Sequence, residues 1–164
     1  MKKKYKGIDL FCGIGGFRLA MNSSQVECVF SSDNDKFAQQ TYEANFHEVP
    51  TGDIKAVDEK DIPKFDILTA GFPCQPFSYA GEKQGFNDEV RGTLFFDVCR
   101  ILEYHKPPMV FLENVKGLKS HDKGKTLQTV LDTLKKLGYY PHWTILSSLS
   151  LIHISEPTRL LSIS

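Results

Sequence analysis

The chain has 164 residues, which suits one compact domain, and a hydrophobic content of 41% is enough for a core. Twenty basic and twenty acidic side chains give a formal net charge of +0, so bulk charge offers no argument for a nucleic-acid partner. The cysteines are too widely spaced for a metal site or a dense disulfide framework, which favours a reducing cytoplasm: Cys12, Cys28, Cys74 and Cys99. No stretch approaches the roughly 20 apolar residues that cross a bilayer, so we expect no membrane contact.

Short apolar runs alternate with amphipathic segments along the chain. The expected strands are 5–11, 27–32, 65–70 and 109–112, and the expected helices begin at or span 17–21, 36–45, 93–104 and 125–137. Asp35 is placed to cap the second helix, and Gly138 to end the last one. The second helix carries Phe37, Thr41, Ala44 and Asn45 at helical spacing.

This alternation predicts an α/β fold with a doubly wound parallel sheet covered by helices on both faces. Ligands of such sheets bind at the carboxyl ends of the strands. The connection 72–92 is unusually long for a compact domain, and long connections are often binding loops.

One cysteine stands at the base of that long connection, between two prolines. The octapeptide is Gly71, Phe72, Pro73, Cys74, Gln75, Pro76, Phe77 and Ser78. Each proline fixes φ and lacks an N–H, so the backbone here must form a shaped loop rather than a helix or a central strand. A thiol in such a loop is placed for nucleophilic attack. The alternative is a small buried hydrophobic residue.

A glycine cluster follows the first expected strand, within Asp9, Leu10, Phe11, Cys12, Gly13, Ile14, Gly15 and Gly16. Glycines at a strand-to-helix turn leave backbone N–H groups free to approach a ligand, which suggests a nucleotide-like cofactor. A dinucleotide fingerprint would need glycine at position 18, where the chain has Arg18, so a dehydrogenase is a poor match. The alternative is a tight turn that serves packing alone.

Carboxylates follow several of the other strands. Asp33 ends the second strand and could accept hydrogen bonds from ribose hydroxyls. Asp53 could accept from an adenine amino group while Ile54 packs on the ring, although surface turns explain these residues equally well. Glu113 ends an apolar strand, where desolvation is expected to raise its pKa; the alternative is a capping or ion-paired glutamate.

Four blocks in order resemble the DNA cytosine-5 methyltransferase family, with the bacterial modification enzymes as the relatives suggested. The blocks are 9–16, 71–78, 91–97 and 111–116, and the resemblance runs from Tyr5 to about Ser148. It implies a Rossmann-like fold that uses S-adenosylmethionine to methylate carbon 5 of cytosine in DNA.

The resemblance also implies roles for individual residues. Cys74 would add to carbon 6 of cytosine, Glu113 in its protonated form would act at ring N3, and Asn114 would hold the neighbouring geometry. The implied cofactor residues are Asp9, Phe11, Gly13, Gly15, Gly16, Asp33, Asn34, Asp53, Ile54, Pro73 and Leu94. Asn34 stands where the family commonly has a tryptophan, so stacking on the adenine is not expected there.

The implied partner is double-stranded DNA with a flipped cytosine, and a cognate restriction endonuclease would act in the same system. The protein is expected to be a monomer. Two other functions remain open: a non-catalytic fragment that binds S-adenosylmethionine, and an RNA cytosine-5 methyltransferase.

The resemblance stops before the family's arginine-rich segment and its target-recognition region. Residues 149–159 look instead like one reading frame of a transposase adapter used in sequencing libraries. We interpret 149–164 as a non-native tail and 1–148 as the amino-terminal part of a catalytic, cofactor-binding domain, incomplete at its C-terminus. This chain alone is therefore expected to be inactive.

Overall fold

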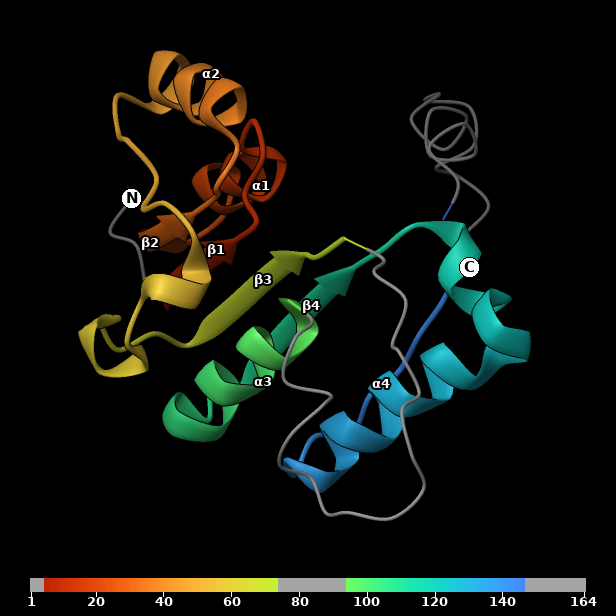
Figure 1. Cartoon of the computed structure of the whole chain (residues 1–164). Coiled ribbons are helices and arrows are strands. Elements are labelled where there is room, and N and C mark those ends of the chain that lie inside the picture. The colour runs from red at the N-terminus through yellow and green to blue at the C-terminus, as the bar shows by residue number, and fades with distance from the viewer. Residues whose placement is uncertain (1–4, 74–93, 147–164) are drawn as a thin grey trace, which may run out of the picture.

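The computed structural model describes residues 5–73 and 94–146 (Figure 1). Cys74, most of the long connection and the interpreted tail at 149–164 lie outside the described residues, so the predictions made for them stay predictions. The strands are β1 (Tyr5–Leu10), β2 (Val26–Ser32), β3 (Ile67–Gly71) and β4 (Met109–Glu113). The α-helices are α1 (Gly16–Ser23), α2 (Lys36–Phe46), α3 (Leu94–His105) and α4 (Lys125–Lys136).

The four strands form a parallel sheet, as the alternating pattern predicted, and the structure gives their order as β2-β1-β3-β4. The chain moves from β1 outward to β2, then crosses to the other side of β1 to form β3 and β4. The order therefore reverses between β1 and β3, and ligands of open parallel sheets bind outside the carboxyl ends at such a reversal. The turns after these two strands contain the glycine cluster and the start of the octapeptide.

Alternate residues of the strands enter two different layers. Ile8, Leu10 and Leu68 are fully buried in a large cluster with Val98 of α3 and Val130 of α4. The opposite face carries a small cluster of Met21 from α1, Val26 and Ile67. Helices thus cover both faces of the sheet, and Figure 1 shows α1 and α2 on the side away from α3 and α4. No helix within the described ranges has the length and apolar character needed to span a membrane.

Helix α2 begins as expected but faces a different way. The Asp35 carboxylate accepts hydrogen bonds from the backbone N–H groups of Phe37 and Ala38, which confirms the predicted cap. The helix, however, buries Tyr42 completely, while Phe37 is 79% exposed. The apolar spacing indicated the wrong buried face. Tyr42 is buried because its hydroxyl contacts Arg18 of α1.

Candidate functional site

Strand pairing brings the predicted site residues to one edge of the sheet. Leu10 pairs with Ser32 on one side and Ala70 on the other, and Gly71 pairs with Glu113. The residues that follow these pairs therefore lie at the carboxyl edge. We define the carboxyl edge by the members of the predicted set that lie there: Phe11, Gly13, Asp33, Pro73, Glu113 and Asn114.

Asp33 is held firmly by the backbone around it. One carboxylate oxygen accepts from the Gly13 N–H at 2.8 Å, and the other accepts from the Asp35 N–H at 2.9 Å. Its carbonyl accepts from the Gln39 side chain, and its own N–H donates to the Thr51 carbonyl. An ionised carboxylate has about four acceptor positions, so both oxygens keep capacity for ligand hydroxyls. The turn after β1 and the end of β2 thus fix one oriented acceptor.

The glycine turn is only partly open to a ligand. The Gly13 N–H donates to Asp33 and the Gly15 N–H donates to the Cys12 carbonyl, so the expectation that both would be free for a ligand is wrong. Gly15 has φ +97°, and a Cβ there would lie 2.1 Å from the Phe46 ring. Added Cβ atoms at Gly13 and Gly16 would meet nothing within 4 Å. Gly15 thus serves packing, whereas Gly13 and Gly16 leave space outside the turn.

Phe11 links the turn to the core. It is half-buried against the large cluster, and its φ of 55° is uncommon for a bulky residue. Such strained residues persist where the surroundings enforce them, often at functional sites.

Asp9 lies beneath this turn and does not reach the surface. Its side chain is fully buried, so the direct cofactor contact expected from the sequence is not available to it. One carboxylate oxygen accepts from the Thr69 hydroxyl at 2.8 Å, and the other has no hydrogen-bond partner among the described residues. Burial outweighs this hydrogen bond and raises the pKa of Asp9 to about 6. Asp9 therefore joins β1 to β3 under the turn.

Glu113 and Asn114 lie at the end of β4, next to the start of the octapeptide. An added Cβ on Gly71 would lie 3.4 Å from a Glu113 carboxylate oxygen, so this carboxylate leans over the end of β3. Glu113 is exposed, and the burial on which the expected desolvation rested is not found. The Asn114 amide donates to the Phe72 carbonyl at 2.6 Å. Phe72 is buried against Phe95, which anchors the residue two positions before Cys74.

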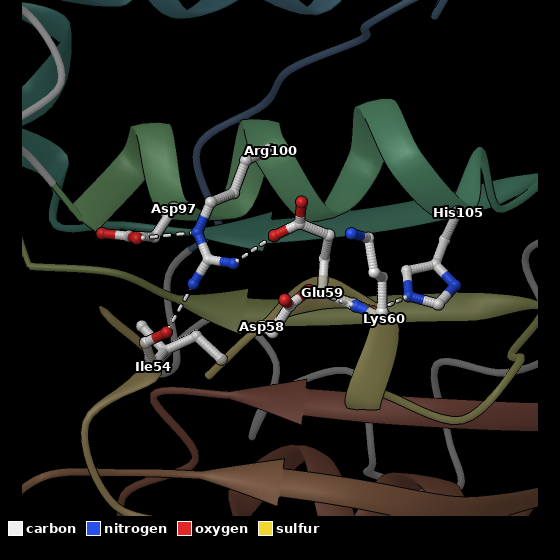
Figure 2. A network of polar contacts seen from close by, with 7 residues as sticks. All are labelled: Ile54, Asp58, Glu59, Lys60, Asp97, Arg100 and His105. Atoms are coloured by element: carbon white, nitrogen blue, oxygen red, sulfur yellow. Dashed lines mark hydrogen bonds and ion pairs between the residues drawn. The ribbon is translucent and has the colours of Figure 1, made fainter. Parts of the chain in front are cut away.

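Ile54 is positioned by a polar network that no motif in the sequence marks (Figure 2). Arg100 of α3 donates to the Ile54 carbonyl, to Glu59 at 2.8 Å and to Asp97 at 3.0 Å. Exposed Asp53 caps the short helix Ile54–Ala56. The Ile54 side chain is only 2% exposed and packs in the core, so it offers little surface to an adenine ring.

The other predicted residues differ in their exposure. Asn34 and Pro73 are exposed, and Leu94 is half-buried at the start of α3. The cysteines within the described residues are poor nucleophiles, because burial raises the thiol pKa of Cys12, Cys28 and Cys99. This leaves Cys74, outside the described residues, as the candidate thiol.

Arg18, which argued against a dehydrogenase, connects α1 to the end of α2. Its guanidinium makes a two-point ion pair with Glu48 at 2.6 and 2.8 Å and lies 5.5 Å from the Phe46 ring centre. This ion pair could not be predicted from local sequence, because Glu48 lies 30 residues away. The only hint is that position 18 carries a long, positively charged side chain.

Comparison with known proteins identifies the family. The family described as C-5 cytosine-specific DNA methylase matches residues 5–151. The chain is 56% identical over 147 residues to the Type II methyltransferase M.DsaV of Dactylococcopsis salina, covering 90% of this chain and 42% of that protein. It is 58% identical over 143 residues to M.HpaII of Haemophilus parainfluenzae, covering 85% of this chain and 40% of that protein. The chain thus spans about two fifths of the length of these relatives.

Solved structures agree on the fold. A mutant of Spodoptera frugiperda DNMT2 superposes with a TM-score of 0.62 at 27% identity, over 82% of this chain and 41% of that one. The S. pombe Dnmt2 methyltransferase gives 0.58 at 23% identity, over 79% and 42%. Because the family match covers nearly all of the described residues, the chain belongs to the C-5 cytosine-specific DNA methylase family.

Proposed function

We propose that the chain is the amino-terminal, cofactor-binding part of an enzyme that methylates carbon 5 of cytosine in DNA. The observation that carries the proposal is the family match over residues 5–151. The geometry supports it, because one edge holds the oriented Asp33 carboxylate, the open space at Gly13 and Gly16, and Glu113 beside the base of the Cys74 loop.

The residues fit S-adenosylmethionine, the methyl donor of this family. Asp33 keeps acceptor capacity for ribose hydroxyls. Gly13 and Gly16 have no side chain, which leaves room for the ligand. Exposed Asp53 is available to an adenine amino group. In this proposal Phe11, Asn34, Pro73 and Leu94 line the pocket, whereas Asp9, Gly15 and Ile54 shape it from within.

The proposed chemistry is nucleophilic catalysis on a flipped base. The Cys74 thiolate forms a bond to carbon 6, Glu113 gives a proton to N3, and the electron pair moves to carbon 5. S-adenosylmethionine, when bound, supplies the methyl group that carbon 5 takes up. A solvent water or hydroxide then takes the carbon 5 proton, which expels the thiolate, and N3 returns its proton to Glu113, so that the aromatic ring and the acid are both restored. Asn114 holds the Phe72 carbonyl and so positions the loop base.

Calorimetric titration with S-adenosylhomocysteine tests the cofactor site. Replacing Asp33→Ala removes hydrogen bonds to a charged group worth about 1.5–3 kcal/mol, so the Kd is expected to rise roughly 10- to 100-fold. Asp58→Ala is the matched control, because Asp58 also accepts from a backbone N–H, that of Lys60 at 2.9 Å, in a different turn. Equal affinity of both variants would contradict the assignment.

We infer that this chain alone does not complete the reaction, since the relatives are more than twice as long. Duplex DNA with labelled S-adenosylmethionine is therefore expected to show no methyl transfer. Robust turnover that Cys74→Ser abolishes would overturn this inference. Cofactor binding without transfer would match the alternative of a non-catalytic fragment for this polypeptide.

A cytoplasmic location, a monomeric state and a cognate restriction endonuclease acting in the same system are further parts of the proposal. The wide spacing of the cysteines supports the reducing compartment.

A further inference from the structure

We propose that the turn after β4 is a contact surface for the phosphate backbone of duplex DNA. This inference rests on the proposed function, because it places the DNA beside the same edge. We call this segment the lysine turn and define it as residues 116–125, which include the short helices Lys116–Lys119 and His121–Gly124.

The lysine turn is strongly basic within a chain of zero net charge. It carries Lys116, Lys119, Lys123 and Lys125 against a single acidic residue, Asp122. The first three lysines are exposed and make no ion pair with any carboxylate in the described part of the chain. The lysines are spread along the segment, so no continuous run of charge marks them in the sequence.

The backbone of the lysine turn is tightly wound. Asp122, Lys123 and Gly124 have consecutive positive φ values of 47°, 54° and 88°. The His121 ring hydrogen-bonds the Thr126 hydroxyl at 2.6 Å and fastens the turn to α4. The Lys119 ammonium lies 5.7 Å from the centre of the Trp143 ring, which is 50% exposed. The charges are thus displayed on an ordered turn, with an aromatic ring beside one of them.

Charge is divided along the carboxyl edge of the sheet. Asp33 lies at the β2 side of this edge, and exposed Asp53 follows Thr51, which pairs with the last residue of β2; the cofactor with its positive sulfonium is proposed there. The lysine turn follows β4 at the other end of the strand order, and Figure 1 shows it on the side of the sheet away from β2 and α2. Glu113 and Asp122 also lie on the β4 side, but the lysines outnumber them, so a polyanion is attracted more strongly to the β4 side than to the β2 side.

The lysine turn starts close to the residues that precede Cys74 in space, which suits a contact with duplex DNA. The lysine turn begins two residues after Asn114, whose side chain holds the Phe72 carbonyl at the base of the Cys74 loop. A flipped base must reach that loop while its strand stays attached, so backbone phosphates must pass close to this edge. Lysines serve there as sequence-independent contacts that position the duplex.

The test is binding of a fluorescent DNA duplex to the full chain, followed by anisotropy between 50 and 200 mM salt. A salt series is needed because phosphate contacts release counterions, so their number sets how steeply affinity falls with salt. Three phosphate contacts contribute a slope of about 2.7 in log K against log salt, or roughly 40-fold in affinity over this range. The triple variant Lys116→Gln, Lys119→Gln, Lys123→Gln is expected to lose that contribution.

A matched triple variant controls for net charge. Lys60→Gln, Lys64→Gln, Lys106→Gln removes the same charge from exposed lysines that precede β3 and β4, away from the carboxyl edge. It is expected to keep nearly the wild-type slope. Equal losses in both triples, an unchanged slope in the first, or no duplex binding by the wild type at 50 mM salt would each overturn the proposal.

Calorimetry with S-adenosylhomocysteine separates this proposal from the proposed function. The first triple variant is expected to bind S-adenosylhomocysteine with the wild-type Kd. Such binding would also show that the variant folds. Absence of cofactor binding in the wild type would count against the proposed function. The salt dependence of DNA binding would still test the surface contact. Loss of cofactor binding in the first triple variant alone would overturn the surface contact, since the lysines would then be structural.

Discussion

Replacing Gly15 with alanine tests whether this glycine is required by packing. Its φ of +97° lies in the left-handed region, where a residue with a Cβ costs about 1–2 kcal/mol. The new Cβ would also lie 2.1 Å from the Phe46 ring. Overpacking of this kind costs about 1–3 kcal/mol. We therefore expect Gly15→Ala to lower the free energy of unfolding by about 2–5 kcal/mol.

Phe46 cannot move away without loss. Its ring packs on Tyr42 with centres 4.7 Å apart and lies under the Arg18 guanidinium. Combining Gly15→Ala with Phe46→Ala removes the overlap but leaves the φ penalty. In that background we expect the cost of Gly15→Ala to fall to about 1–2 kcal/mol, which gives a coupling energy of about 1–3 kcal/mol.

Urea unfolding, followed by circular dichroism and by the fluorescence of the single tryptophan, measures these differences. Gly16→Ala is the matched control, because an added Cβ there meets nothing within 4 Å and the residue is helical. It is expected to be neutral or stabilising by up to about 1 kcal/mol. If Gly15→Ala unfolded at the same urea concentration as Gly16→Ala, the packing explanation would be refuted.

Two further predictions concern polar groups, one buried and one half-buried. The Asp9 pKa rises from 3.8 unfolded to about 6 folded, so the native state binds the extra proton between these values and wild-type stability falls as pH rises through this range. Asp9→Asn should lack this loss, which amounts to about 3 kcal/mol above pH 6. The difference in unfolding free energy between the two proteins, compared at pH 4 and pH 7, measures the loss. A difference that does not change with pH would contradict the assignment. Arg100→Met should cost about 2 kcal/mol in urea unfolding, because its hydrogen bonds to Glu59, Asp97 and the Ile54 carbonyl are lost. In a double-mutant cycle Glu59→Gln should show coupling to Arg100, whereas Asp132→Asn should show none.

The local structure could be predicted from the sequence because its signals are local. The Asp35 cap, the end of α4 near Gly138 and the four parallel strands follow from capping chemistry and alternating patterns within a few residues. The face of α2 could not be predicted in this way. Tyr42 is buried by the contact with Arg18, which is 24 residues away.

The site shows the same division between local and distant causes. Asp33 and Glu113 were found from their places at strand ends, and strand pairing puts both at the carboxyl edge. The exposure of Glu113 could not be foreseen, because it depends on β4 lying at the end of the strand order in the described sheet. Cys74 stays a prediction, since it lies outside the described residues.

The sequence by itself determined the elements and the residues at the strand ends, because their signals lie in neighbouring positions. It also determined the family, through four separate blocks in a fixed order. Only the tertiary structure decided which groups surround those residues. It buried Asp9 against Thr69, assigned Gly15 to the Phe46 contact, and separated the acidic end of the carboxyl edge from the lysine turn. The reason is physical: burial, steric overlap and the field around a site depend on groups that are close in space and distant along the chain.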